Sequence, residues 1–273
     1  MKKKYVVSVV LALIGICLLI YPFASSYVNS LQQNEVVTEY ETVVENKNSD
    51  EVEKQYKKAK EYNQKITKTI GNDNEYNNIL NFTEDGMIGS INIPKVNVNL
   101  PIYHGTDDIT LSHGIGHFQS FPIGDENSHA VLVGHSGMMS QEMFTNIMQL
   151  KIGDIFTVTV ANREVTYEID QIKTVLPDET EDLKIEKGKS YCTLLTCVPY
   201  GVNSHRLLVR GHKVSINDYS KEEIEVKNNK IVTFTDKLGI LSLVIGLTIM
   251  LSVPVVVYSV RKRTNERNEE KKQ

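Results

Sequence analysis

Two long stretches of the chain carry no charged residue and are predominantly apolar. They are Tyr5–Tyr21, which follows Lys2–Lys4, and Leu238–Val260, which precedes Arg261–Arg263. Their lengths of 17 and 23 residues suit membrane-spanning helices. Because basic residues favour the cytoplasmic side, both termini are expected in the cytoplasm and the body outside. The first stretch also fits a cleaved signal peptide ending near Ala24–Ser26, but its apolar core is long for one, so we favour an anchor.

Between the first apolar stretch and the body, the pattern predicts a linker and one helix. Tyr27–Asn48 is polar without a clear period and is interpreted as a juxtamembrane linker. Spacings of three and four residues then predict one face of a helix. The residues of that face are Val52, Tyr56, Ala59, Asn63, Ile66 and Ile70. Gly71 follows as a stop signal, and the segment that continues to Asp85 is loop-like.

From Met87 onward the pattern changes to short β-branched runs separated by turn residues. The predicted strands are Ile88–Ile93, Val96–Leu100, His129–Val133, Ile155–Val160, Val165–Ile172 and two runs within Tyr191–Val214. Strands this frequent predict a mainly β domain, either a closed antiparallel barrel or a sandwich. One short helix is expected at Gln141–Leu150, where apolar residues share a face.

These patterns divide the chain into six parts. They are an N-terminal membrane anchor or signal segment at 1–26, a region with linker, amphipathic helix and loop at 27–85, a β domain at 86–216, a linker at 217–237, a C-terminal transmembrane helix at 238–260 and a basic cytoplasmic tail at 261–273.

The two runs within Tyr191–Val214 predict a hairpin with a cysteine and an arginine at its turn end. The first run ends at Cys197 and the second opens at His205-Arg206, with Pro199, Gly201, Asn203 and Ser204 as turn residues between them. The hairpin therefore brings a thiol close to a fixed positive charge. Strand alternation places Cys192 on the opposite face from Cys197, so Cys192 is the candidate core residue and a disulfide between the two is not expected.

Composition narrows the functional classes. The chain has three cysteines, too few for a disulfide framework. Tyr27–Lys237 holds 21 basic and 31 acidic residues, which argues against a nucleic-acid partner. The cysteine and histidine spacing matches no common zinc pattern, and neither a metal nor a cofactor is expected.

An unpaired cysteine outside the cell suggests a nucleophile, which needs a base nearby. Among seven histidines, His135 stands out because Gly134 and Gly137 surround it directly after the apolar run His129–Val133. Those glycines allow the backbone to bend and leave room for a substrate. We therefore expect His135, Cys197 and Arg206 to form a catalytic group, and Thr196 and Ser136 to contact the substrate.

This arrangement resembles the sortase family. The matching text is Thr193-Leu194-Leu195-Thr196-Cys197, with Arg206 nine positions later and His135 upstream. Leu100–Thr106, the Gly-His-Ser-Gly turn at 134–137 and His205–Gly211 look like class C sortases, which polymerise pilins, and the second apolar span fits that class too. The resemblance covers roughly Tyr56–Val214. It implies a closed eight-stranded β-barrel with short helices, here with an N-terminal helix and two transmembrane helices.

The resemblance also implies a function. Such enzymes of Gram-positive bacteria cut an LPxTG-like sorting signal between Thr and Gly. Cys197 would form the thioester, His135 would transfer protons, and Arg206 would hold the substrate and stabilise the oxyanion. The acceptor would be a pilin lysine in pilus assembly. A peptidoglycan amine, as in cell-wall anchoring, is the close alternative. A cysteine hydrolase and a non-catalytic tethered binding domain are more distant ones.

The chain departs from class C in one respect. Class C enzymes usually carry a lid with an Asp-Pro-aromatic anchor, but no proline lies between Pro22 and Pro94. The lid region, expected within Gly71–Asp85, therefore lacks that plug in its usual form, and Asp73 is the candidate remnant. We expect a cleft that is more open at rest or gated differently.

Overall fold

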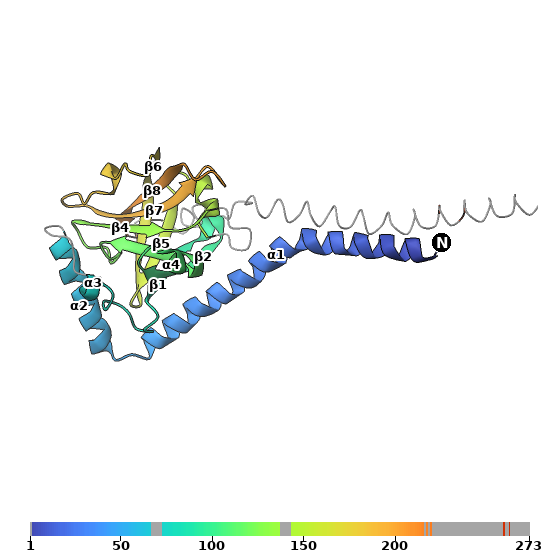
Figure 1. Cartoon of the computed structure of the whole chain (residues 1–273). Helices are drawn as coiled ribbons and strands as arrows, with labels where there is room; N and C mark the ends of the chain where they lie inside the picture. Colours follow the sequence, from blue (N-terminus) through green and yellow to red (C-terminus); the bar gives the residue numbers. More distant parts are fainter. Residues whose placement is uncertain are drawn as a thin grey trace, which may run out of the picture. The chain divides into compact units, whose positions relative to one another are not determined.

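The computed structural model describes residues 2–66, 73–136 and 143–215, and the single positions 217, 219, 259 and 262. The chain divides into two compact units. One holds residues 1–27 and 232–273, and the other extends from Val28 to Ile231 and contains all the strands (Figure 1).

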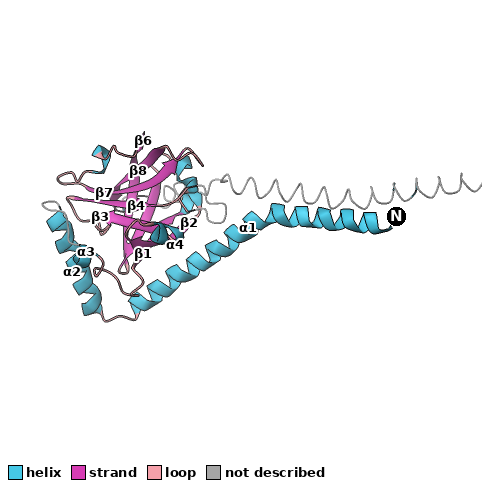
Figure 2. Ribbon diagram, viewed as in Figure 1, coloured by secondary structure: helices cyan, strands magenta, loops and turns pink. Residues whose placement is uncertain are grey.

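Eight strands close into one barrel in the order β1-β2-β3-β4-β7-β8-β6-β5 (Figure 2). The strands are β1 Met87–Ile93, β2 Val98–His104, β3 Ile115–Gln119, β4 Ser128–Val133, β5 Ile155–Val160, β6 Arg163–Val175, β7 Ser190–Val198 and β8 His205–Val214. Of the two architectures that the strand pattern left open, the closed barrel is confirmed. The barrel is not wholly antiparallel, however, because the β2–β3 and β4–β7 pairs are parallel.

The predicted strands agree with the observed ones except in two places. The strand expected at Val96–Leu100 begins at Val98, because Pro94–Val96 form a 3-10 turn and Asn97 follows in the left-handed region at φ 56°. β3 was missed, because Ile115–Gln119 is short and contains a glycine and a histidine that weaken its strand pattern.

In the described residues, the short helix α3 Asp73–Tyr76 precedes β1, and four short helical elements lie between strands. These are α4 Asp108–His113 and the 3-10 helices Pro94–Val96, Thr145–Gln149 and Glu181–Leu183. The helix expected at Gln141–Leu150 is thus a 3-10 helix in its described part, and residues 141 and 142 lie outside the described residues. Asp107 caps α4, since its carboxylate accepts hydrogen bonds from the backbone of Ile109 and Thr110 at 3.0 and 3.1 Å.

The linker predicted for Tyr27–Asn48 is wrong. These residues continue helix α1, Lys2–Glu45, which is followed by α2, Ser49–Ile66. Val37, Tyr40 and Val44 are buried in the barrel unit, and the Tyr40 hydroxyl donates to the carbonyl oxygen of Ile88 at 2.7 Å. Their spacing of three and four residues is a helical signal that the polar surroundings obscured.

The predicted helix from Val52 is confirmed in α2 as far as Ile66, while Ile70 lies outside the described residues. Asn63 on its buried face exchanges two hydrogen bonds with the backbone of Phe121, at 3.0 and 2.7 Å. Because a buried amide is costly without partners, this exchange fixes where α2 lies on the barrel.

Among the residues that the structure describes, α1 is the one helix long and apolar enough to cross a membrane. The predicted anchor Tyr5–Tyr21 lies in its N-terminal part. The second predicted span, 238–260, falls outside the described residues apart from Ser259. The linker at 217–237 and the tail at 261–273 fall outside them too, apart from single positions.

Several histidines are part of the barrel core. His117 is 0% exposed, its Nε2–H donates to the carbonyl oxygen of Ser120 at 2.8 Å, and its Nδ1 lies 2.8 Å from the Tyr76 hydroxyl. Burial lowers the pKa of His117 to about 3, and burial also lowers the pKa of His104 and of His129. Burial therefore disfavours the protonated form of all three rings.

Acidification should destabilise the fold through His117. The unfolded ring has an ordinary pKa of about 6.5 and binds a proton that the folded ring excludes. The contribution of His117 to the free energy of unfolding is therefore complete above a pH of about 6.5 and is lost as the pH falls towards 3. From pH 7 to pH 5 the free energy of unfolding should fall by about 2 kcal/mol from this residue. Urea unfolding of the full-length chain in detergent micelles measures it. His117→Gln should flatten the dependence and the exposed His113→Gln should not; equal wild-type stability at both pH values would contradict the assignment.

Candidate active site

The site begins with the parallel pairing of β4 and β7, whose C-terminal ends lie side by side. Their register pairs Val133 with Leu195, and it continues past the end of β4 because the amide of Gly134 donates to the carbonyl oxygen of Leu195 at 3.0 Å. The Ser136 hydroxyl donates to the carbonyl oxygen of Cys197, so the segment that carries His135 is held beside the end of β7. That the His135 ring meets the Cys197 thiol stays a prediction.

The β7–β8 hairpin adds the third residue. In its antiparallel register Cys197 is paired with Arg206, as the sequence pattern predicts. The connecting turn is closed by two hydrogen bonds to the carbonyl oxygen of Pro199, from the amides of Val202 and Asn203 at 3.0 and 2.9 Å. His135, Cys197 and Arg206 are all partly exposed, so a ligand can reach all three side chains.

Gly134 has a packing role beside His135. A Cβ atom added there would lie 2.7 Å from the Phe144 ring and 2.8 Å from Cδ1 of Ile115. The amide of Phe144 also donates to the carbonyl oxygen of His135 at 3.0 Å. The glycine is therefore needed for close approach, which seats the His135 segment on the barrel; Gly137 lies outside the described residues.

Thr196 and Ser136 cross-link the ends of β4 and β7. The Thr196 hydroxyl donates to the carbonyl oxygen of Gly134 at 2.7 Å, and the Ser136 hydroxyl donates to the carbonyl oxygen of Cys197. Thr196 is 0% exposed, so the predicted contact between its side chain and a substrate does not fit the structure. A substrate contact of Ser136 stays a prediction.

Arg206 is held by its own turn. Its guanidinium donates to the carbonyl oxygens of Asn203 and His205 at 3.0 and 3.2 Å. In the described part of the chain it has no carboxylate partner, whereas Arg210 on the same strand face is bound by Asp170 at 2.9 Å. The charge of Arg206 is therefore available to a ligand, whereas the charge of Arg210 is paired with Asp170 within the barrel.

An apolar strip lies on the same outward face as Cys197. It consists of Val131, Leu183 and Leu208, which are buried, and Phe118, Val133, Val175 and Leu195, which are partly exposed. Leu195 precedes Cys197 by two residues, and Leu208 is paired with Leu195. Strand alternation along β7 puts Leu195 on the face of Cys197, but sequence analysis assigned it no function. An apolar residue on the face that points away from the core is the sequence feature that could have indicated a binding surface.

The described part of the expected lid region lies elsewhere. Tyr76, at the end of α3, stacks on Phe121 with ring centroids 5.5 Å apart, and its hydroxyl bonds to His117. Phe121 belongs to the connection from β3 to β4, whereas Cys197 lies where β4 and β7 end. Leu80, farther along the segment, is 0% exposed. The segment from Asp73 onward is thus anchored at the other end of the barrel, and the differently gated cleft stays a prediction.

In the described residues, no group of three or more His, Cys, Asp or Glu side chains is placed to hold a metal ion. The chemistry available at this site is that of a thiol, an imidazole and a guanidinium.

Comparison with known proteins gives the site its context. The sortase domain model matches residues 91–214. Sortase D of Bacillus subtilis is 34% identical over 130 residues, which are 46% of this chain and 64%, less than two thirds, of that protein. The solved structure of sortase C1 from Streptococcus agalactiae is 43% identical, with a TM-score of 0.64, and the match covers 66% of this chain and 98% of that chain.

The chain belongs to the sortase family. A sortase C of Clostridium perfringens, solved with its C-terminal cell wall sorting motif, is also similar, at 37% identity and a TM-score of 0.61 over 67% of this chain and 99% of that one. These two solved structures are sortases C, while the curated relatives include a sortase D and sortases A. In this sortase, His135, Cys197 and Arg206 all lie within the matched domain.

The Thr196 hydrogen bond should be a measurable part of the stability of this sortase. Thr196→Val keeps the shape but leaves the buried carbonyl of Gly134 without a donor, so the free energy of unfolding should fall by about 1–3 kcal/mol. Thr196→Ser keeps the hydroxyl and loses one methyl group, at about 1 kcal/mol or less. Urea unfolding of the two variants measures the difference. A valine variant as stable as wild type would show that the bond does not hold β4 to β7.

Proposed function

We propose that this sortase is a membrane-anchored cysteine transpeptidase that cuts an LPxTG-like sorting signal and joins it to an amine. The proposal is supported by the pairing of Cys197 with Arg206 and by the hydrogen bonds of Gly134 and Ser136 that hold the His135 segment beside the end of β7. A nucleophile, a proton carrier and a fixed positive charge on one accessible edge are the groups that acyl transfer requires.

In the first half of the reaction the sulfur of Cys197 attacks the carbonyl carbon of the signal threonine. Arg206 stabilises the oxyanion, and it can do so at any relevant pH because a guanidinium keeps its proton. The bond to the following glycine then breaks, and protonated His135 gives its proton to the departing amine. The acyl half stays on Cys197 as a thioester.

In the second half an incoming amine attacks the thioester. Neutral His135 takes a proton from that amine, and the sulfur of Cys197 departs as the new amide bond forms. A thioester keeps most of its acyl reactivity, so an amine held in the site can compete with water.

The apolar strip supports a signal that begins with leucine and proline. Leu195 and Val133 give partly exposed apolar surface beside Cys197, and burying such surface favours binding by about 25 cal/mol per Å². The related Clostridium perfringens enzyme, solved with a sorting motif, is consistent with this substrate class. A plain cysteine hydrolase and a non-catalytic tethered domain account less well for the three residues together.

The acceptor separates two closely related functions. Likeness to sortases C favours a pilin lysine and therefore pilus assembly, and a cell-wall amine is the alternative acceptor. Competition between a lysine-containing pilin peptide and a peptidoglycan stem peptide for the thioester would separate them. We favour the pilin lysine on the structural likeness.

We also propose that the chain crosses the membrane twice. The apolar part of α1 would form one span and residues 238–260 the other, with Lys2–Lys4 and Arg261–Arg263 in the cytoplasm. The barrel and its site would then face outward, where secreted proteins carrying sorting signals arrive.

A thioester trap tests the reaction. Full-length protein in detergent micelles, mixed with an LPxTG-like peptide without an acceptor, should gain the mass of the acyl fragment on Cys197. Cys197→Ala should gain nothing while keeping wild-type unfolding behaviour, because the residue is partly exposed and packs little. His135→Ala should lower the rate of adduct formation by about 100-fold or more. Undiminished peptide cleavage by folded Cys197→Ala would sink the proposal.

A further inference from the structure

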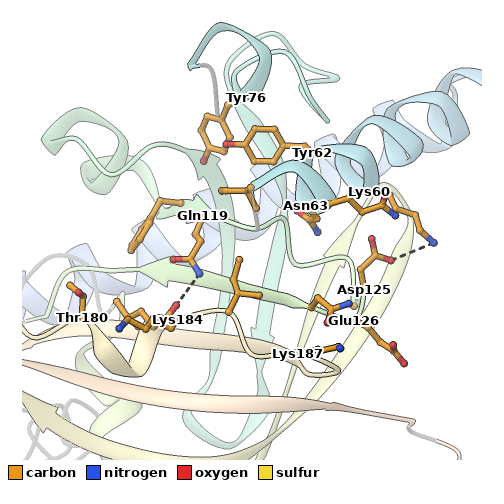
Figure 3. Close-up of a pocket in the computed structure, with 17 residues that line it drawn as sticks. Lys60, Tyr62, Asn63, Tyr76, Gln119, Asp125, Glu126, Thr180, Lys184 and Lys187 are labelled. Atoms are coloured by element: carbon orange, nitrogen blue, oxygen red, sulfur yellow. Dashed lines mark hydrogen bonds and ion pairs between the residues drawn. The ribbon is translucent and has the colours of Figure 1, made fainter. Parts of the chain in front are cut away.

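A large groove lies on the barrel away from the joined strand ends. Its volume is about 1510 Å³, and its lining includes Asn63 and Ile66 of α2, Phe118 and Gln119 of β3, and Leu183 and Ile185 of the β6–β7 connection. Figure 3 shows Lys60, Tyr62 and Asn63 along one side, with Thr180, Lys184 and Lys187 along the other. None of these residues belongs to the catalytic group described above.

The walls of this groove are fixed by hydrogen bonds. The Gln119 side chain donates to the carbonyl oxygen of Leu183 at 2.9 Å, and buried His129 holds the carbonyl oxygen of Lys184 at 3.0 Å. Asn127 accepts from the amide of Gly188 at 2.7 Å. The β6–β7 connection is therefore held against the barrel at several points, so the groove exists before any ligand arrives, and a ligand need not order it.

The groove is continuous with the apolar strip, because Phe118 and Leu183 belong to both. The strand registers give the length of the path. Val131 is paired with Phe118 on one side and with Thr193 on the other, and Thr193 precedes Cys197 by four residues. Four residues of extended chain span about 13 Å. The strip is thus about as long as four residues of a bound, extended peptide.

We propose that the groove is an extended subsite for the polypeptide segment immediately upstream of the sorting signal. This inference rests on the proposed function. The acyl half of an LPxTG-like signal has four residues, Leu-Pro-x-Thr, and with its carbonyl at Cys197 and its apolar leucine on the strip it ends beside Phe118. The next residues towards the N-terminus of the substrate then enter the groove.

The size and chemistry of the groove suit this occupant. Small-molecule sites usually measure roughly 300–1,000 Å³, and this groove is larger. Ile66, Phe118 and Ile185 give it apolar surface, while lysines and acids lie among the lining residues. Side chains of an extended peptide point alternately to opposite sides, so apolar residues at every second upstream position would face the groove and the others would face water.

The test compares two labelled peptides on the full-length chain in detergent micelles. One is the sorting signal alone, and the other carries eight further upstream residues with leucine at alternate positions. Dissociation constants are measured by fluorescence anisotropy on Cys197→Ala protein, and turnover on wild type in parallel. The longer peptide should bind at least about tenfold more tightly. In turnover the gain should lie in KM and leave kcat unchanged, because groove binding is the same in ground and transition states.

Two matched variants locate the effect. Ile185→Asp places a charge in the groove and should reduce the ratio of the two dissociation constants to about one. Ile152→Asp makes the same change at an exposed residue that does not line the groove and should leave the ratio as in wild type. Equal binding of the two peptides to the parent protein, or an equal loss in both variants, would overturn the subsite. If neither peptide is turned over, the proposed function fails, while the binding ratio still decides the groove.

Discussion

The parallel pairing of β4 with β7 is the constraint on which this structure depends. Both strands run towards the same edge of the barrel, so the segment just beyond β4 lies beside the last residues of β7. The amide of Gly134 extends that register by one hydrogen bond, and the hydroxyls of Thr196 and Ser136 add two more across the same seam. The His135 segment is therefore held beside the end of β7, and Arg206 is paired with Cys197 because β8 turns back from β7.

The two faces of β7 explain why its two barrel cysteines differ. Cys192 points into the core, is 0% exposed, and burial raises the pKa of its thiol well above the usual range, so it stays neutral and unreactive. Cys197, five residues later, lies on the other face and is partly exposed. The same outward face carries the apolar strip and leads to the groove. The alternation of side chains along β7 thus places Cys192 in the core and Cys197 on the outer face, next to the apolar strip.

The sequence predicted best the features that depend on residues close together in the chain. One hairpin predicted that Cys197 lies next to Arg206, and strand alternation predicted that Cys192 faces the core. The β4–β7 pairing is non-local and parallel, so no turn sequence predicts it. His135 was chosen because glycines lie on both sides of it. The catalytic role of His135 stays a prediction, and the structure shows that Gly134 is needed for packing against Phe144. Thr196 was expected to contact the substrate, but strand alternation turns its side chain inward, where it is buried. The helical face of Val37, Tyr40 and Val44 in α1 was missed because three apolar residues are too few to show a clear period in a polar stretch.

Disulfide trapping at the β4–β7 seam tests the central claim most directly. Neighbouring strands lie about 4.8 Å apart, within the Cα separation that a disulfide accepts. In full-length His135→Cys protein, mild oxidation should join the new cysteine to Cys197, and peptide mapping by mass spectrometry should find that pair. The same substitution combined with Cys197→Ala should give no such cross-link. If Cys197 stays reduced in the single variant while the chain remains folded, His135 and Cys197 are not neighbours, and the account of the site fails.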